Sequence, residues 1–427
     1  MTAEMKSKPV WVWLPGKTEP TRCGTFSWQL GLGQFVYDRD YLAGGSALAL
    51  DPVRIPLSRS RQPESESKLN GLFGVFRDAS PEGFGLDLLR QRVGKPLTDA
   101  LELLELSEGD GVGAVVVCDD IESKARFKPA PLEALNLRLK ALPSEGYGSC
   151  AVEDLISVRS TALGGERPKL TVLHKGQMWI AKVQSRGDAP NAPLREYFAM
   201  SIARSIGIDA AEVEFQRQGD HQTVLVRRFD RHIDASGEVQ RRLFASAWTA
   251  LQLDKTSTRG DDKGRSYVKL ALELQRWCAA PGADVIAIKR ELWRRMAFNA
   301  VCHNGDDHPR NHGLLNTDGR WALSPAYDIA PPATFGGTLA MDVTREGDSV
   351  ASRWALLREC QSFGYEDDEA SEFIDAAVDA VRTRWPAEVK AQGFEVADVP
   401  APTTSWMESP IPHNVLLRRR ARLRRHR

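Results

Sequence analysis

Apolar residues follow a helical spacing in the second half of the chain and a strand-like spacing in much of the first half. The longest clear helix is predicted for residues 283–301, because four apolar side chains recur on one face of it. These side chains are Val285, Ile288, Leu292 and Met296. Two further helices are predicted for residues 271–277 and 366–385, the second ending before Pro386. The C-terminal half is therefore expected to be mainly helical.

The first part of the chain has the pattern of short strands and two short helices. Strands are predicted for residues 10–14, 25–28, 35–37, 41–42 and 47–50, and a buried strand for 111–117. Helices are predicted for residues 84–93 and 97–106, and an exposed loop for 58–68. None of these segments carries reactive side chains at catalytic spacing. We expect a small α+β domain for packing or partner binding, followed by a passage of residues 123–148 that leads out of it.

The middle of the chain combines a pair of glycines with three strand-like segments. Gly164 and Gly165 precede the segments 170–173, 177–183 and 223–226. Glycine lets backbone N–H groups approach a phosphate closely, as in the loop that covers the nucleotide in kinases. A plain hairpin turn is the alternative interpretation of this pair.

Lys182 lies near the end of the alternating segment 177–183, between apolar neighbours. A helix is predicted after Pro193, with Glu196 in its first turn. In bilobal kinases a strand lysine contacts the nucleotide phosphates and is oriented by a helix glutamate. The alternative is a lysine at an exposed strand edge, where lysine is common.

A polar loop follows the predicted helix 283–301, with the sequence Asn304-Gly-Asp-Asp-His-Pro-Arg-Asn311. Asp306 precedes Asn311 by five residues, and Asp328 follows a predicted hairpin. Phosphoryl transfer needs a carboxylate that takes the proton of the attacking hydroxyl, an Asn that holds magnesium, and a second Asp that completes the metal site. A polar turn with solvated acids is the alternative when this short pattern is taken alone.

These parts occur in the order in which a kinase uses them. We therefore predict an α+β, bilobal protein-kinase-like fold with a small N-terminal α+β domain and a mainly helical C-lobe. Residues 1–150 are predicted to form the N-terminal domain. Residues 151–252 are predicted to form the kinase N-lobe, and residues 253–427 the C-lobe with the catalytic loop.

Composition excludes several other classes of protein. The 57 basic and 57 acidic residues cancel, so global charge indicates neither a nucleic-acid nor a membrane partner. Six scattered cysteines without a C-x-x-C pair argue against a zinc site and favour reduced thiols in the cytoplasm. We expect no signal sequence and no membrane span, because no uncharged run approaches the roughly 18 residues that a span requires.

The last twelve residues, 416–427, include seven arginines. Such a tail is usually disordered and solvated. The functional alternative is contact with the phosphates of nucleic acid or with an acidic partner.

Four motifs together resemble the HipA-type toxin kinases, which are bacterial serine/threonine protein kinases of type II toxin–antitoxin systems. The motifs are Leu163-Gly-Gly-Glu-Arg-Pro-Lys169, Val226-Arg-Arg-Phe-Asp-Arg231, Gly305-Asp-Asp-His-Pro-Arg-Asn311 and Ser324-Pro-Ala-Tyr-Asp328. The segments Tyr41-Leu42 and Ser80-Pro-Glu-Gly83 resemble the N-terminal domain of the same family, so the resemblance covers nearly the whole chain.

The resemblance implies a role for each site residue. Asp306 is expected to be the catalytic base, and Asn311 and Asp328 the magnesium ligands. Lys182 is expected to bind the ATP phosphates, oriented by Glu196.

The same resemblance implies further contacts with the nucleotide. The backbone from Arg227 to Phe229 is expected to form the hinge that holds adenine, with Asp230 nearby. His308 is expected to orient the loop around the nucleotide, because a kinase has no chemical step that needs it.

Family members often carry a serine in the glycine-rich loop that becomes autophosphorylated and switches the kinase off. The matching position here is Ala162, and Thr161 and Ser160 are the nearest hydroxyls. The switch is therefore absent or moved to one of these two residues.

The resemblance also implies a HipB-like antitoxin with a helix-turn-helix, operator DNA bound through that complex, and a protein substrate such as an aminoacyl-tRNA synthetase. Two alternatives stay open at this point. One is a kinase of the same fold that acts on a small molecule. The other is a catalytically silent module that acts through an antitoxin and DNA.

Overall fold

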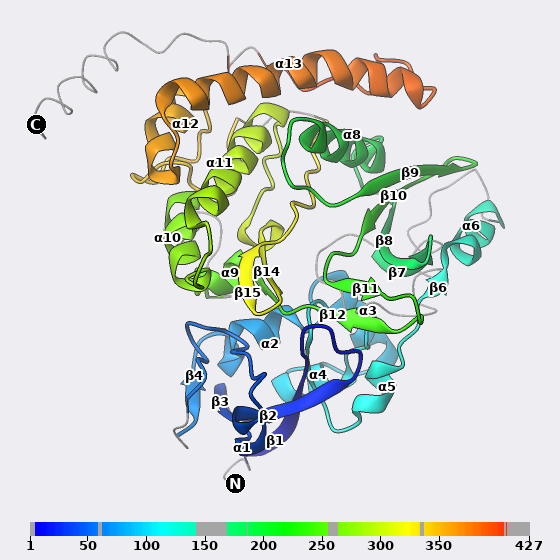
Figure 1. Cartoon of the computed structure of the whole chain (residues 1–427). Helices are drawn as coiled ribbons and strands as arrows, with labels where there is room; N and C mark the ends of the chain where they lie inside the picture. The colour runs from blue at the N-terminus through cyan, green and yellow to red at the C-terminus, as the bar shows by residue number, and fades with distance from the viewer. Residues whose placement is uncertain are drawn as a thin grey trace, which may run out of the picture.

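The structure is a computed structural model of the chain, and it describes residues 5–58, 62–141, 169–185, 187–254, 264–333, 337–404 and residue 407. Figure 1 shows the N-terminal residues as a unit of their own at the bottom of the view. A second sheet lies above it, and long helices pack beside and across that sheet. This arrangement agrees with the predicted α+β fold.

The N-terminal part is built on an antiparallel sheet with the strand order β4-β3-β2-β1-β5. Its strands are β1 (Lys6–Trp13), β2 (Pro20–Gln29), β3 (Leu32–Tyr37), β4 (Glu64–Glu66) and β5 (Val115–Val117). Its helices are α1 (Arg39–Ala43), η1 (Leu69–Gly71), α2 (Gly74–Asp78), α3 (Phe84–Val93), α4 (Ala100–Leu106) and α5 (Ile121–Ala125). Phe26, Phe35 and Phe76 pack against one another between sheet and helices, with ring centroids 5.0–6.2 Å apart in the cluster they form with Phe73.

Two strands predicted here are wrong. Residues 41–42 lie in helix α1, and residues 47–50 form no strand. The reason is tertiary: Tyr41 is buried, stacks on Tyr37, and donates a hydrogen bond from its hydroxyl to the carbonyl oxygen of Leu48. The loop 58–68 also contains the short edge strand β4, which pairs with β3.

The second sheet has the strand order β6-β7-β8-β10-β9. Its strands are β6 (Ala130–Pro131), β7 (Lys169–His174), β8 (Gln177–Val183), β9 (Val213–Gln218) and β10 (His221–Arg227). Helix α8 (Ala192–Ser205) packs on β9 and β10, as Figure 1 shows in green. The predicted strands at 170–173, 177–183 and 223–226 and the predicted helix after Pro193 are confirmed.

One pair of elements belongs to this sheet although the predicted boundary at residue 150 assigns it to the N-terminal domain. Strand β6 pairs in parallel with β7, and helix α6 (Leu132–Ala141) follows it directly. Leu132, Leu135 and Leu139 are buried in one apolar cluster with residues of β7, β8 and β10. Burial of this leucine face draws residues 130–141 to the second sheet.

The C-terminal part is mainly helical, as predicted. Its helices are α9 (Ala247–Ala250), α10 (Tyr267–Trp277), α11 (Val285–Cys302), η2 (Pro309–Asn311), α12 (Arg353–Glu359), η3 (Cys360–Phe363) and α13 (Asp367–Ala391). Its strands are β13 (Phe244–Ser246), β14 (Gly313–Thr317) and β15 (Arg320–Leu323). Strands β11 (Arg231–Ile233) and β12 (Val239–Arg241) form a two-stranded sheet that packs beside β8. Helix α11 lies in the centre, packs on α10 and α13, and buries Leu292, Trp293 and Met296 completely.

Helix α13 does not end before Pro386, so that prediction is wrong. The helix continues to Ala391 with Pro386 inside it. Proline removes one intrahelical hydrogen bond and costs roughly 3 kcal/mol in a helix interior. Trp385 and Val389 are fully buried on either side of it, and this burial offsets the cost.

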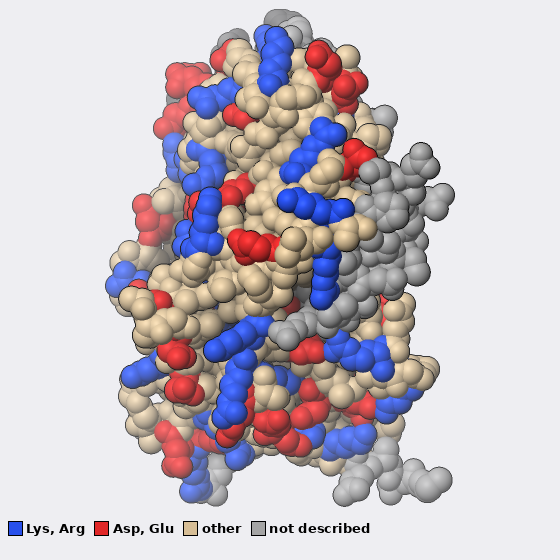
Figure 2. Space-filling model, turned by 90° about the vertical axis from the view of Figure 1, so that its right-hand side faces the viewer, with Lys and Arg blue, Asp and Glu red and all other residues tan. Residues whose placement is uncertain are grey.

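The surface carries both signs of charge. Figure 2 shows basic and acidic side chains interspersed over the face it displays, in keeping with the balanced composition. Within the part of the chain that the structure describes, no helix is long and apolar enough to cross a membrane. The five described cysteines are buried and form no disulfide bond with one another.

Candidate active site

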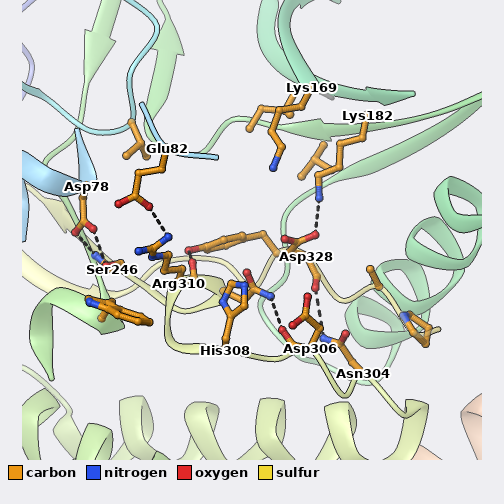
Figure 3. A pocket seen from close by; sticks show the side chains of 18 of the residues that line it. Asp78, Glu82, Lys169, Lys182, Ser246, Asn304, Asp306, His308, Arg310 and Asp328 are labelled. Atoms are coloured by element: carbon orange, nitrogen blue, oxygen red, sulfur yellow. Dashed lines mark hydrogen bonds and ion pairs between the residues drawn. The ribbon is translucent and has the colours of Figure 1, made fainter. Parts of the chain in front are cut away.

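A large cavity, with a volume of about 1110 Å³, opens between the second sheet and the end of helix α11, and residues 78–82 of the N-terminal part close one side of it. Eight of the predicted site residues line it, together with side chains from the N-terminal part. The predicted residues are Lys182, Arg227, Phe229, Asp230, Asp306, His308, Asn311 and Asp328. Figure 3 shows Lys182 and Asp328 on one side of this cavity and Glu82 and Arg310 on the other.

The predicted catalytic loop, residues 304–311, begins where helix α11 ends. His303 caps the helix in the left-handed region with φ 62°, which turns the chain toward the cavity. Asp306 is exposed there. The side-chain amide of Asn311 donates to the backbone oxygen of Asp306 at 3.1 Å, so the predicted magnesium ligand and the predicted base are joined across the loop.

The neighbouring carboxylate, Asp307, has a different environment. It is 2 % exposed, and its Oδ2 accepts hydrogen bonds from the Tyr267 hydroxyl, from Asn299 Nδ2 at 2.6 Å and from His312 Nε2 at 3.0 Å. Burial raises the pKa of the Tyr267 phenol well above its usual value, so the phenol remains a donor. Asp307 thus ties the loop to helices α10 and α11, a role that sequence spacing did not reveal.

We expect Asp307→Asn to destabilise the fold by about 2–4 kcal/mol, because an amide cannot accept from all three buried donors. Urea unfolding followed by circular dichroism measures this loss. The matched control is Asp306→Asn, one residue away and exposed, which should change the free energy of unfolding by less than about 0.5 kcal/mol. Equal stabilities for the two variants would contradict the assignment.

Lys182 lies inside the cavity rather than at a strand edge, because β8 is the central strand of its sheet. Its Nζ is 2.6 Å from Glu196 Oε1 and 2.7 Å from Asp328 Oδ1. The Glu196 side chain is 1 % exposed and the Lys182 side chain 12 %. The structure therefore brings together three residues that the sequence places 14 and 146 positions apart.

Opposite charges keep both Lys182 and Asp328 ionised. Burial lowers the pKa of Lys182, but the charges of Asp328 and Glu196 outweigh burial, and the pKa lies above its usual value. Burial raises the pKa of Asp328, but Lys182 and then Lys169 outweigh it, and the pKa falls well below its usual range. Asp328 is thus a carboxylate at neutral pH.

The backbone at Asp328 is in the left-handed region, with φ 59°. For a non-glycine residue this conformation is uncommon and often found at functional sites. The backbone oxygen of Asp328 accepts a hydrogen bond from Asn304 Nδ2 at 3.4 Å, so the start of the catalytic loop holds the residue in place. Figure 3 shows this contact at the backbone of Asp328 and the ion pair of its carboxylate with Lys182.

Oxygen donors suited to magnesium lie at Asn311 and Asp328. The Asn311 amide nitrogen is used in the bond to Asp306, which leaves the carbonyl oxygen for a ligand. Lys182 contacts Oδ1 of Asp328 and leaves Oδ2. Magnesium usually takes one or two protein oxygens plus water and substrate phosphates, so this donor set fits it. In the described ranges, no group of three His, Cys, Asp or Glu side chains forms a denser metal site.

The predicted hinge runs from Arg227 to Phe229 at the end of β10. The Arg227 side chain points away toward Glu212, with NH1 3.0 Å from Oε2. The N–H groups of Arg227 and Arg228 donate to the backbone oxygens of Glu212 and Met178. The Phe229 N–H makes no hydrogen bond to any described residue, which leaves a donor for an adenine ring.

Asp230 is held by protein groups. Its carboxylate is 3 % exposed and accepts hydrogen bonds from Arg228, Arg231 and the Gly113 N–H at 2.8–3.0 Å. Burial raises its pKa, but the two arginines outweigh burial and lower it well below the usual range. Arg231 also donates to the backbone oxygen of Gly113. Asp230 therefore connects the hinge to the N-terminal part, and its carboxylate is engaged there.

Lys169 is a cavity residue that was not predicted. It lies opposite Lys182 in the register between β7 and β8, and Figure 3 shows its side chain directed into the cavity. Two lysines facing each other across a ladder repel. Asp328 offsets part of this repulsion, since the charges of both lysines lower its pKa. The sequence did contain a signal for this pair: Lys169 and Lys182 lie at equal distances from the turn between β7 and β8, so a hairpin places them opposite each other.

Four predicted residues lie outside the described part of the chain. They are Gly164 and Gly165 of the glycine-rich loop and the phosphorylation candidates Thr161 and Ser160. The arginine-rich tail also lies outside it. These assignments stay predictions.

Two family models match the chain. The HipA-like C-terminal domain matches residues 161–385, and the HipA N-terminal domain matches residues 12–118.

Two relatives are similar to this chain in sequence, and one solved structure shares its fold. The chain is 25% identical over 331 residues to a putative kinase, Y4mE, of Sinorhizobium fredii, covering 71% of this chain and 76% of that protein. It is 23% identical over 316 residues to the serine/threonine-protein kinase toxin HipA of Shewanella oneidensis, covering 69% of this chain and 71% of the relative. A solved complex of Shewanella oneidensis HipA with HipB and operator DNA superposes with a TM-score of 0.63 at 19% identity, covering 91% of this chain and 92% of that one.

Proposed function

The chain belongs to the HipA-type kinase family, and on that premise we propose that it is an ATP- and magnesium-dependent serine/threonine protein kinase. We propose further that it acts as the toxin of a toxin–antitoxin pair and arrests growth by phosphorylating a cellular protein. The observation that carries the proposal is the contact of Lys182 with both Glu196 and Asp328, at 2.6 and 2.7 Å. An active kinase requires the ion pair between this lysine and the helix glutamate, and it requires the Asp that holds magnesium to lie beside them.

Each residue has a defined task in this proposal. Lys182 and Lys169 neutralise phosphate charge, and the hinge at Phe229 holds the adenine. Magnesium, bound by Asn311 and Asp328, would neutralise the charge that develops on the transferred phosphoryl group. Asp306 accepts the proton of the serine or threonine hydroxyl as that oxygen attacks.

The partners belong to the same proposal. The relative of known structure was solved with HipB and operator DNA, so we propose a HipB-like antitoxin and operator DNA bound through it. The similar overall fold over 91% of the chain supports this assignment. Action in the cytoplasm, where ATP and protein substrates meet, is part of the proposal.

The division into parts 1–150, 151–252 and 253–427 is also kept as a proposal, with residues 130–141 packing on the second sheet.

Incubation of the purified protein with γ-labelled ATP, magnesium and a phosphatase-treated whole-cell lysate tests the activity. We expect a discrete protein band to take up label, with phosphoserine or phosphothreonine after acid hydrolysis. Omission of magnesium should abolish the signal. Label in small molecules without any protein band would favour the small-molecule kinase. No turnover of ATP at all would favour the silent binding module.

A further inference from the structure

A segment of the N-terminal part, residues 78–82, reaches the wall of the active-site cavity. At its start, the Asp78 carboxylate accepts hydrogen bonds from the Ser246 N–H, the Ser246 hydroxyl and the Thr249 hydroxyl, each at 2.7 Å. Ser246 ends β13, which pairs with β14 directly after the catalytic loop. The segment is therefore fixed against the C-terminal part at one end.

At its other end, Glu82 contacts the catalytic loop itself. Its Oε2 is 2.5 Å from Arg310 NH1, and its Oε1 is 3.0 Å from Arg77 NH2. Arg77 is buried, which fixes the carboxylate from behind. Figure 3 shows the Glu82 side chain directed at Arg310 across the cavity wall.

Arg310 is in turn connected to the reacting groups. It lies in η2, next to Asn311 and two residues after His308. Its guanidinium carbon lies 4.7 Å from the ring centroid of Trp248, and its backbone oxygen accepts a hydrogen bond from the Tyr327 hydroxyl at 2.6 Å. Tyr327 precedes Asp328. Arg310 thus links the N-terminal part, the catalytic loop and the segment that carries Asp328.

We propose that Glu82 is a positioning residue for phosphoryl transfer, which acts through Arg310 to hold the catalytic loop in its working geometry. The inference rests on the proposed kinase function. It gives the N-terminal part, in which the sequence shows no catalytic motif, a contribution to catalysis. A displacement of about 1 Å in an active site can lower a rate by about 10²-fold, so a contact of this kind affects the rate without touching substrate.

The test compares Glu82→Gln with wild type and with Asp87→Asn. Asp87 is the matched control because it is an exposed acid in helix α3. Its ion pair, with Arg90, stays within that helix. The first readout is the rate of label transfer from ATP to the lysate band. We expect Glu82→Gln to lower kcat by about 10- to 100-fold with little change in the KM for ATP, while Asp87→Asn matches wild type.

Two further measurements separate positioning from a loss of folding. Arg310→Gln and the double variant Glu82→Gln/Arg310→Gln complete a cycle, and the double variant should be no slower than the slower single one, because both changes remove the same contact. Hydrogen exchange of a peptide covering residues 303–317 should be faster by about tenfold in Glu82→Gln and unchanged in Asp87→Asn.

The exchange experiment needs no enzymatic activity, so it decides the inference even where the wild-type protein transfers no phosphate. Unchanged exchange in the loop of Glu82→Gln would overturn the positioning role. An active wild type with an equally active Glu82→Gln would also overturn it and would leave the kinase assignment intact. Additive effects in the cycle would show that Glu82 does not act through Arg310.

Discussion

Replacing Asp306 with Asn is expected to lower the rate of phosphate transfer by at least about 10²-fold, with a melting temperature close to that of wild type. The amide keeps the size of the carboxylate and cannot take the proton of the attacking hydroxyl. Asp306 is exposed at the cavity and its side chain is not part of the buried network of Asp307, so the fold should tolerate the change. Label transfer to a protein band and thermal unfolding measure the two quantities.

The same variant offers a test in cells. Overexpression of the wild-type protein is expected to arrest growth, and overexpression of Asp306→Asn is not. Near-wild-type turnover of the variant would place the catalytic base elsewhere. If the variant loses phosphate transfer and also no longer unfolds in a cooperative transition, Asp306 is needed for the fold and not for the chemistry.

Replacing Asp328 with Asn should also reduce transfer by at least about 10²-fold, for a different reason. The change removes the negative charge that contacts Lys182 and that would face the proposed magnesium ion. The left-handed backbone at this position favours Asn at least as well as Asp, and Lys182 keeps its ion pair with Glu196. We therefore expect a folded protein whose activity requires more magnesium than that of wild type.

A magnesium titration of the transfer rate measures this effect. The matched control is Asp318→Asn, because Asp318 also has a positive φ, 52°, but lies in the β14–β15 turn. That variant should keep the wild-type rate and magnesium dependence. An Asp328→Asn protein with an unchanged magnesium curve would remove Asp328 from the metal site.

The sequence by itself determined the main elements around the site and the order of the site residues. Periodicity predicted helix α11 and strand β8, because a helix or strand face that meets the core repeats its apolar residues over a few positions. Five-residue spacing predicted that Asp306 and Asn311 lie in one loop, and the chain order of Lys182, Glu196 and Asp328 predicted the bilobal fold.

The tertiary structure decided which of these residues meet, because contacts between distant segments depend on how whole elements pack. Asp306 and Asp307 are adjacent residues of the same type. Burial alone distinguishes them: Asp306 is exposed, and Asp307 is buried and holds the loop. Asp230, predicted near the nucleotide, is enclosed by two arginines and Gly113. Glu82 meets Arg310 although 228 positions separate them (310 minus 82), and no local pattern encodes such a contact. Its partners come together only when the N-terminal sheet, α9 and the catalytic loop are packed against one another.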